Sequence, residues 1–271
     1  MFIKNFEQNK AIMMNIYKDQ KYILALEYIN VMVMVFPMSE KSSKDSRSNT
    51  PDRKPSMEGI KDPGVAKSFE KMARLPPFKI LRRRIISELK TIGPTGSLID
   101  IGCGTGNLLV EIANKYNALD LTGMDISDEI LEQANNFIKE RNLEKKIELK
   151  IGSTEDIPFS DNTFDIAVSS LSLHHWVNPQ KAFSEIFRII KKNGSLLIFD
   201  FNRNAKKFYY RFLKFVTKRI VPKPLKKINE PIGSLQASYT KEEVLELISG
   251  LTFQNVDIKP YGAWMFIIIK K

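Results

Sequence analysis

The stretch Ser97-Leu-Ile-Asp-Ile-Gly-Cys-Gly-Thr-Gly-Asn-Leu-Leu109 decides the fold of this chain. Its apolar part, residues 97–101, predicts a buried strand that runs into Gly102, Gly104 and Gly106. Glycines lack a Cβ, so the backbone can turn sharply and a ligand can lie against it. The residues after the loop repeat with helical spacing: Leu108, Leu109, Ile112 and Ala113. A strand, a glycine turn and a helix together predict a binding site at the carboxyl end of an open α/β sheet.

An acidic residue ends the next expected strand. Residues 119–124 predict that strand, and Asp125 follows it. A carboxylate in this place can accept both hydrogens of a ribose diol, which indicates a nucleotide-type ligand. Two glycine patterns compete for the loop. The dinucleotide fingerprint G-x-G-x-x-G/A fails, because Asn107 stands at its last position when the count starts at Gly102. The pattern D-x-G-x-G-x-G, from Asp100 to Gly106, fits.

From residue 97 onward, strand and helix patterns alternate with short joins, which is typical of βαβ units and a parallel sheet. The expected strands are 97–101, 119–124, 147–151, 164–170 and 195–201. Ser127 is the expected N-cap of one helix, and Asn178-Pro179 opens another. We expect Asn193-Gly194 to close that second helix.

The C-terminal part follows a different pattern. A capping box, Thr240-Lys-Glu-Glu243, precedes an apolar helix. The last two expected strands, 253–258 and 264–269, are joined only by Pro260-Tyr-Gly262. That join is too short for a parallel crossover, so the two strands should form an antiparallel hairpin.

These motifs resemble those of the class I S-adenosylmethionine-dependent methyltransferases. Residues 100–106 are similar to the first motif of that family. Residues 152–165 and 171–176 are similar to later motifs of its small-molecule members, including those of ubiquinone and menaquinone synthesis. The resemblance covers the chain from about Phe69 to its end. It implies an α/β fold: a Rossmann-like, doubly wound, seven-stranded and mostly parallel sheet with an antiparallel C-terminal hairpin strand.

The resemblance implies S-adenosyl-L-methionine as cofactor and indicates where it binds. The glycines of the loop would face its methionine part, with Asp100 close by. Asp125 would hold the ribose hydroxyls, and Ile126 would stack beside the adenine. Ser170 and Leu171 would border the methionine carboxylate and the substrate. The expected cofactor-binding residues are Asp100, Gly102, Gly104, Gly106, Asp125, Ile126, Ser153, Thr154, Glu155, Asp156, Ser170 and Leu171.

One of these positions departs from the family pattern. Many relatives carry an Asp that accepts from the adenine amino group after the third strand, and this chain has Ser153 there. Either the Ser153 hydroxyl substitutes for it, or Glu155 or Asp156 supplies the carboxylate. Thr154 is a further candidate. The sequence leaves these alternatives open.

The only two histidines of the chain, His174 and His175, are the candidates for catalysis. An imidazole that titrates near neutral pH can take a proton from a substrate hydroxyl, amine or carbon acid. The structural alternative is that one caps the helix near Asn178 while the other packs against Trp176. A single cysteine, Cys103, and two adjacent histidines predict no metal site.

The first 56 residues differ from the rest, and we expect a poorly ordered extension there and a methyltransferase domain over 57–271. The apolar stretch 23–36 is interrupted by Glu27 and Asn30 and is shorter than the ~20 residues that span a bilayer. Residues 39–56 are polar and read as a linker. The lone cysteine favours a reducing, intracellular location, which we take as the cytoplasm.

The net charge of +11 is concentrated in one segment, because no acidic residue lies between Asp200 and Glu230. Aromatic residues recur there at helical spacing among ten basic ones. We expect 203–239 to be a lid-like insertion, with 203–227 as a possible contact to a membrane surface. Stacking on single-stranded nucleic acid is the weaker alternative, because no RNA-binding signature accompanies the segment.

The predicted function is methyl transfer from S-adenosylmethionine to a small, apolar metabolite. An RNA or protein methyltransferase is the first alternative, and a cofactor-binding adaptor without activity is the second. After the fourth strand, Ser170-Leu-Ser-Leu173 stands where enzymes that methylate planar amines carry an Asn/Asp-Pro-Pro-Tyr type motif. This difference argues against methylation of base amines.

Overall fold

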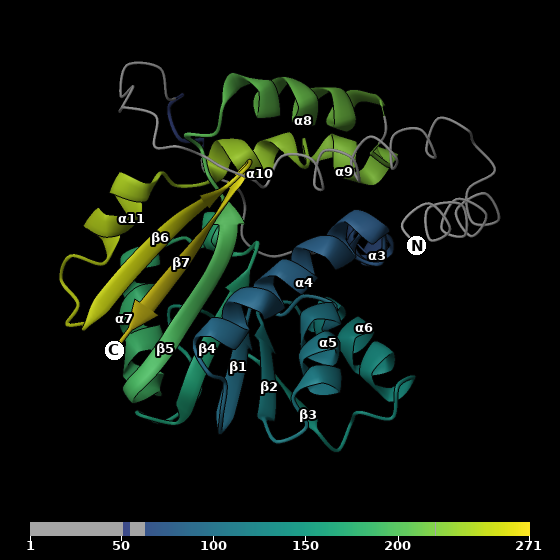
Figure 1. Ribbon diagram of the computed structural model, residues 1–271. Helices are drawn as coiled ribbons and strands as arrows, with labels where there is room; N and C mark the ends of the chain where they lie inside the picture. The colour runs from purple at the N-terminus through teal and green to yellow at the C-terminus, as the bar shows by residue number, and fades with distance from the viewer. Residues whose placement is uncertain (1–50, 55–62, 220) are drawn as a thin grey trace, which may run out of the picture.

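A twisted seven-stranded sheet with helices on both faces forms the centre of the molecule (Figure 1). The computed structural model describes residues 51–54, 63–219 and 221–271. The strand order is β3-β2-β1-β4-β5-β7-β6, and β7 runs antiparallel to both of its neighbours. The expected doubly wound sheet with an antiparallel C-terminal hairpin is confirmed. The predicted extension 1–56 lies outside the described residues except for 51–54.

The strands are β1 (Ser97–Ile101), β2 (Asp120–Asp125), β3 (Ile147–Ile151), β4 (Phe164–Ser170), β5 (Ile190–Phe201), β6 (Asn255–Tyr261) and β7 (Trp264–Lys270). The helices are α3 (Pro63–Ala73), α4 (Pro76–Thr91), α5 (Asn107–Lys115), α6 (Asp128–Lys139), the 3-10 turn η2 (Leu173–His175), α7 (Pro179–Ile189), α8 (Lys207–Arg219), α9 (Lys223–Lys227), α10 (Ile232–Ala237) and α11 (Lys241–Leu247).

Alternation along the strands divides the core into two layers. In β1, Leu98 belongs to a buried cluster with residues of α4, α5 and α6, whereas the next residue, Ile99, belongs to a cluster with residues of α7 and α11. Successive side chains of a strand point to opposite faces, so a fully apolar strand fills both layers. The sheet is therefore covered on both sides, as its apolar strands predict.

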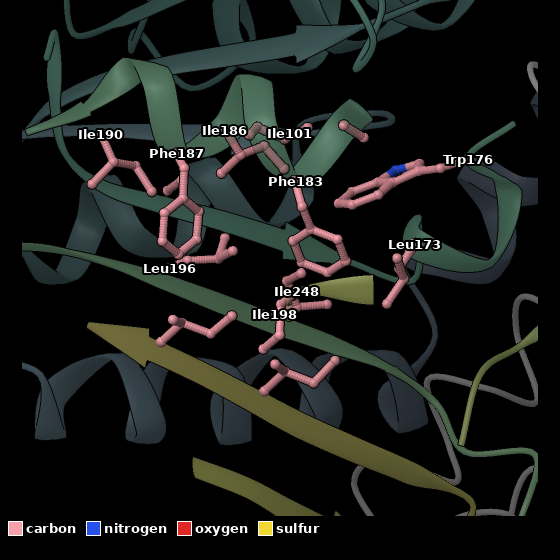
Figure 2. Packing of buried hydrophobic residues seen from close by; sticks show 14 of the residues in the cluster. Ile101, Leu173, Trp176, Phe183, Ile186, Phe187, Ile190, Leu196, Ile198 and Ile248 are labelled. Carbon is pink, nitrogen blue, oxygen red and sulfur yellow. The ribbon is translucent and has the colours of Figure 1, made fainter. Parts of the chain in front are cut away.

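The second layer fixes the turn that carries both histidines. Figure 2 shows Phe183 and Phe187 of α7 packed over Leu196 and Ile198 of β5. Trp176 lies beside this cluster, with its ring centroid 5.6 Å from that of Phe183. Leu173, at the start of η2, is buried in the same cluster. Since apolar anchors flank His174 and His175 on both sides in the sequence, the position of η2 is set by burial.

The three helix starts that the sequence predicts at Ser127, Asn178 and Thr240 are confirmed. The Ser127 hydroxyl accepts from the backbone N–H of Ile130 at 3.3 Å, and the Asn178 side chain accepts from the N–H of Lys181 at 3.1 Å. Thr240 and Glu243 form a complete capping box at the start of α11. Each cap satisfies backbone donors that the helix itself leaves unpaired.

The prediction that Asn193-Gly194 closes a helix is wrong. Helix α7 ends at Ile189, and β5 already begins at Ile190, which pairs with Phe164 of β4. The pairing then shifts register, and Asn193 takes a left-handed φ of 65° inside the strand. Asn193 and Gly194 therefore form a β-bulge in β5 and do not end a helix.

The predicted insertion 203–239 folds into three helices, α8, α9 and α10, above the carboxyl ends of the strands (Figure 1). Tyr209 and Leu213 of α8 pack with Leu235 of α10 and with Phe201 at the end of β5. Val216 of α8 packs with Val65 of α3 in a separate small cluster. These helices and α3 therefore cover the carboxyl ends of the strands, where parallel sheets have their binding sites.

Candidate active site

The glycine loop after β1 turns with three left-handed residues. The φ angles of Gly102, Gly104 and Gly106 are 71°, 55° and 72°. A Cβ on Gly102 would lie 2.3 Å from the Ser172 hydroxyl oxygen, whereas a Cβ on Gly104 would meet nothing within 4 Å. Gly102 is therefore required by close packing. Gly104 is required by its φ angle, and it leaves open space beside the backbone.

That open space belongs to a cavity of about 280 Å³ at the carboxyl ends of β1, β2 and β4, which we call the cofactor cavity. Of the expected cofactor-binding residues, the following line it: Asp100, Gly102, Gly104, Asp125, Ile126, Thr154, Ser170 and Leu171. His175 also lines it. Gly106, Ser153, Glu155 and Asp156 are not among its lining residues. Gly106 instead occupies the N-cap position of α5.

Asp125 is built into the loop that it faces. Its Oδ2 accepts from the backbone N–H of Gly104 at 2.9 Å, and its Oδ1 accepts from that of Ser127 at 3.1 Å. Burial raises the pKa of Asp125 from its ordinary value, although these backbone hydrogen bonds act in the opposite direction. The carboxylate thus ties the end of β2 to the glycine loop and also lines the cavity.

Asp100 is buried at the end of β1 with an unsatisfied oxygen. Among the described residues, its Oδ1 has no hydrogen-bond partner. Burial, and then the nearby charge of Asp125, raise the pKa of Asp100 to about 8. A buried acceptor without a partner is costly, so this oxygen fits a donor supplied by a ligand.

Two polar side chains of the turn after β3 accept hydrogen bonds from backbone N–H groups. The Ser153 hydroxyl accepts from the N–H of Glu155 at 3.2 Å. The Glu155 carboxylate accepts from the N–H of Asn178 at 3.0 Å, which holds the start of α7. Thr154 lines the cavity, and its buried hydroxyl has no partner among the described residues. Of the alternatives for the missing adenine-binding Asp, Thr154 is the one whose hydroxyl is available at the cavity.

His174 forms a buried pair with Asp200 of β5. Its Nδ1 lies 2.7 Å from Asp200 Oδ1, and its backbone N–H donates to Oδ2 at 3.1 Å. Both side chains are only 1% exposed. Sequence reasoning missed Asp200, although an acidic residue within the apolar run 196–201 is an available signal. The structural alternative, in which one histidine caps a helix near Asn178, does not apply to His174, because its ring binds Asp200.

The contact with Asp200 uses only Nδ1 of the His174 ring. His174 Nε2 has no hydrogen-bond partner among the described residues. Burial disfavours the charged ring, but the charge and hydrogen bond of Asp200, with a contribution from Glu230, outweigh it and raise the pKa of His174. With its Nδ1–H directed to Asp200, the neutral ring presents Nε2 as a proton acceptor.

His174 opens onto a second cavity of about 450 Å³, which we call the acceptor cavity. Its walls are mainly apolar side chains of α3, α4 and α8, including Met72, Phe78 and Phe212. Leu171 and His175 line both cavities, as do Phe69, Met72, Phe78 and Leu81. The two cavities therefore share a wall, and the histidine turn η2 stands beside it.

The polar side chains that line the cofactor cavity fit S-adenosylmethionine. Asp100 and Thr154 present buried oxygens that have no partner within the described part of the chain, and Asp125 adds a carboxylate at the end of β2. These acceptors suit the ammonium, amino and hydroxyl groups of that molecule. The exposed Ile126 side chain supplies an apolar surface next to them.

Two further features are absent from the described part of the chain. There, no three His, Cys, Asp or Glu side chains gather into a group that could hold a metal ion. None of the helices described combines the length and the apolarity that crossing a membrane requires.

Comparison with known proteins agrees with the geometry. Residues 99–198 match a family model described as a methyltransferase domain. The chain is 28% identical over 196 residues to the ubiquinone/menaquinone biosynthesis C-methyltransferase UbiE of Citrifermentans bemidjiense, which covers 71% of this chain and 82% of that one. It is 25% identical over 161 residues to the UbiE of Geotalea daltonii, covering 58% and 68% of the two chains.

Solved structures share the fold. A protein from Methanococcus maripaludis, described as an S-adenosyl-L-methionine-dependent methyltransferase, superposes with a TM-score of 0.63 at 24% identity over 86% of this chain and 97% of that one. Phosphoethanolamine N-methyltransferase 2 of Haemonchus contortus, solved with S-adenosyl-L-methionine, has a TM-score of 0.53 at 18% identity over 70% and 52%. The chain is an S-adenosylmethionine-dependent methyltransferase that acts on a small molecule, and it is similar to UbiE and to other class I methyltransferases.

Proposed function

We propose that this enzyme methylates an apolar small molecule that binds in the acceptor cavity, with His174 as the general base. The observation that carries the proposal is an apolar cavity that shares a wall with the cofactor cavity and is lined by His174, whose Nε2 has no hydrogen-bond partner among the described residues. Apolar walls with a few placed polar groups are typical of small-molecule sites.

The cofactor cavity holds S-adenosylmethionine through residues at the ends of three strands. Asp100 and the loop of Gly102 and Gly104 take the methionine part. Asp125 binds the ribose hydroxyls, and Thr154 receives the adenine edge beside Ile126. Ser170 and Leu171 border the methionine end and the acceptor. Bound in this way, the cofactor supplies an activated methyl group on a sulfonium, so orientation and exclusion of water provide much of the rate.

The acceptor carries an acidic proton at the atom that reacts or next to it. His174 Nε2 takes that proton, Asp200 stabilises the resulting imidazolium, and the acceptor gains the methyl group. UbiE is named as a C-methyltransferase. Loss of a proton from a phenol or enol hydroxyl, or from a carbon acid, makes a carbon atom nucleophilic, as methylation at carbon requires. The indole N–H of Trp264 is also buried without a described partner, and Trp264 lines the same cavity. It offers the acceptor a second hydrogen bond.

Methyl-labelled S-adenosylmethionine tests this function. The purified enzyme is incubated with cell extract, and label is counted in the organic-soluble, aqueous, RNA and protein fractions. We expect label in the organic-soluble fraction. Label in RNA or protein would overturn the proposal in favour of a macromolecular substrate. Cofactor binding without transfer to any fraction would indicate an adaptor.

The exposed face of α8 supports a second proposal, that the enzyme works in the cytoplasm and touches a membrane surface. Phe208 and Phe215 are 43% and 54% exposed, although both are large apolar residues. Exposed basic residues surround them: Lys206, Lys207, Arg211, Lys214, Lys218 and Arg219. A face that mixes Phe with Lys and Arg suits an anionic lipid surface. The buried face of the same helix lines the acceptor cavity, so 203–239 would act as the lid through which an apolar molecule enters.

Vesicle co-sedimentation tests the contact. The enzyme should bind phosphatidylglycerol-containing vesicles at low salt and be released at high salt, and Lys214→Gln with Lys218→Gln should weaken binding by roughly 1 kcal/mol per charge. If the enzyme is retained on RNA but not on vesicles, the basic face of α8 binds nucleic acid and not a membrane. Absence of binding to either would leave the lid without a membrane role.

A further inference from the structure

We infer that Arg53, from a segment far upstream of the sheet, is a positioning residue for His174. The inference rests on the proposed function, because it concerns how the base is held. It also makes residues 51–54 part of the acceptor side of the enzyme, although they precede the glycine loop by more than forty residues in the sequence.

Arg53 joins three parts of the chain that surround the histidine turn. Its Nε donates to the carbonyl of Ala237 at 2.7 Å, and its Nη2 donates to the carbonyl of His174 at 3.5 Å. The guanidinium also lies over the ring of Tyr239, 4.2 Å from the ring centroid. One planar side chain thus links η2 to the C-terminal end of α10 and to the residues that follow it. A guanidinium can do this because its donors form a rigid fork and its face stacks on aromatic rings.

The backbone around Arg53 is held independently. The N–H of Lys54 donates to the carbonyl of Gln236 at 3.0 Å. Arg203 is only 5% exposed, and it donates to the carbonyl of Pro51 at 2.8 Å and to that of Ser238 at 2.7 Å. Arg203 is itself paired with Glu243 of α11. Residues 51–54 therefore lie as a strap against residues 236–239, with Arg53 directed to η2.

Charged groups from three elements face the His174 ring. Asp200 of β5 and Glu230, just before α10, favour its protonated form, and Arg53 disfavours it. His175 stacks at 4.1 Å between ring centroids. Arg53 therefore has two effects on the proposed base. It fixes the backbone of η2 through the carbonyl of His174, and it opposes the two carboxylates, so the neutral, proton-accepting ring is more populated.

The test uses the full chain and three variants. Arg53→Ala removes both effects, and Arg53→Lys keeps the charge but not the planar fork. Lys54→Ala is the matched control, because the contact of Lys54 with the described residues is a backbone hydrogen bond to Gln236. Imidazole NMR signals report the titration directly, since the chain has only two histidines. In Arg53→Ala we expect the His174 midpoint to move to higher pH and its signals to shift. In Arg53→Lys the midpoint should stay close to that of the wild type, and in Lys54→Ala nothing should change.

Enzyme turnover provides the second readout. Because small misplacements of a catalytic group are costly, Arg53→Ala should lower kcat roughly tenfold to a hundredfold at neutral pH. It should also shift the rising limb of the kcat–pH profile to higher pH, and S-adenosylmethionine affinity should be unchanged. Unchanged His174 signals and titration in Arg53→Ala would overturn the inference. Failure of the proposed function is a different result. Full turnover in His174→Asn would show that His174 is not the general base, and the NMR comparison would still decide whether Arg53 positions His174.

Discussion

The two cavities of this enzyme are built in different ways. The cofactor cavity is lined by the ends of neighbouring strands, and its contacts follow short motifs such as Asp100 to Gly106. The acceptor side is assembled from remote segments: His174 pairs with Asp200, and Arg53 reaches His174 across 121 positions of sequence. Local motifs can hold the cofactor, whereas the substrate side depends on tertiary contacts between segments that lie far apart in the sequence. The predictions below separate these two halves.

The largest effect should come from the acceptor half alone. His174→Asn keeps a side-chain N–H near the position of Nδ1, and so keeps the bond to Asp200, but it removes Nε2. Loss of a general base typically costs 10² to 10⁴ in rate, so we expect kcat to fall by about that factor. S-adenosylmethionine affinity, measured by isothermal titration, should stay unchanged.

The neighbouring histidine is the control for this variant. His175 lines both cavities, so His175→Asn should cost less in kcat and change cofactor affinity slightly. A larger loss of kcat in His175→Asn than in His174→Asn would assign the base to the other ring. Equal cofactor losses in both variants would show that the two halves are not separable.

The cofactor half should fail next, through the glycine loop. Gly104→Val places a branched side chain at a φ of 55°, in the open space beside the loop. Strain of 1–3 kcal/mol and the lost space together should weaken S-adenosylmethionine binding by about a hundredfold or more. Isothermal titration measures this affinity.

Gly93 is a matched control for the loop. It has a φ of 64° and would also meet nothing within 4 Å, yet it lies between α4 and β1 and lines neither cavity. Gly93→Val should reproduce the backbone strain and leave the affinity intact. Equal loss of affinity in the two variants would mean that strain alone acts, and that the space at Gly104 is not used by the cofactor.

The same contrast explains how much the sequence could predict. The sheet, its order of elements and the residues of the glycine loop follow from hydrophobic period and local spacing, because each strand and turn is encoded by its own neighbours. The departure at Ser153 is visible in the sequence, but the proposal that Thr154 takes its place is not. It depends on the hydrogen bonds that occupy Ser153 and Glu155.

The acceptor half could be predicted only in part. The spacing of aromatics placed the helix over Phe208 to Phe215, but it did not indicate which rings are buried, since that depends on what the helix packs against. Asp200 lies inside a strand, and its partner His174 lies 26 positions earlier. No periodic pattern links such residues. The strap at 51–54 fell within a stretch whose composition indicates a linker, and only its tertiary contacts set it apart.

A smaller effect should follow from Asp125→Ala. The variant loses the expected bonds to the ribose diol, which should cost about 1.5–3 kcal/mol of cofactor affinity. It also loses the acceptor for the N–H groups of Gly104 and Ser127. Asp125→Asn separates the two roles, because its amide oxygen can still accept from one of these groups. Unchanged affinity in Asp125→Ala would leave it only a role in holding the loop.

The smallest effect is a pH dependence that belongs to the cofactor half. Burial, with the charge of Asp125, raises the pKa of Asp100 to about 8, so the free enzyme carries a protonated Asp100 at pH 7. If Asp100 Oδ1, which has no partner among residues 51–54, 63–219 and 221–271, receives the ammonium of the cofactor, binding favours the ionised form and expels a proton. Affinity should then rise with pH, by less than about tenfold per pH unit, and level off above about pH 8.

Isothermal titration at pH 7 in phosphate and in Tris measures this proton release, because the two buffers differ in ionisation enthalpy. The demethylated product keeps the same ammonium, so it should release the proton as S-adenosylmethionine does. Asp100→Asn should abolish the release. Stability gives an independent check with the same sign: a carboxyl whose folded pKa is raised stabilises the fold at low pH, and that contribution is lost as the pH rises from about 4 to about 8. The ligand-free wild type should therefore lose stability across this range relative to Asp100→Asn. If the difference in unfolding free energy between the two proteins does not change with pH, the titrating group is not Asp100. The ammonium of the cofactor would then bind at another residue.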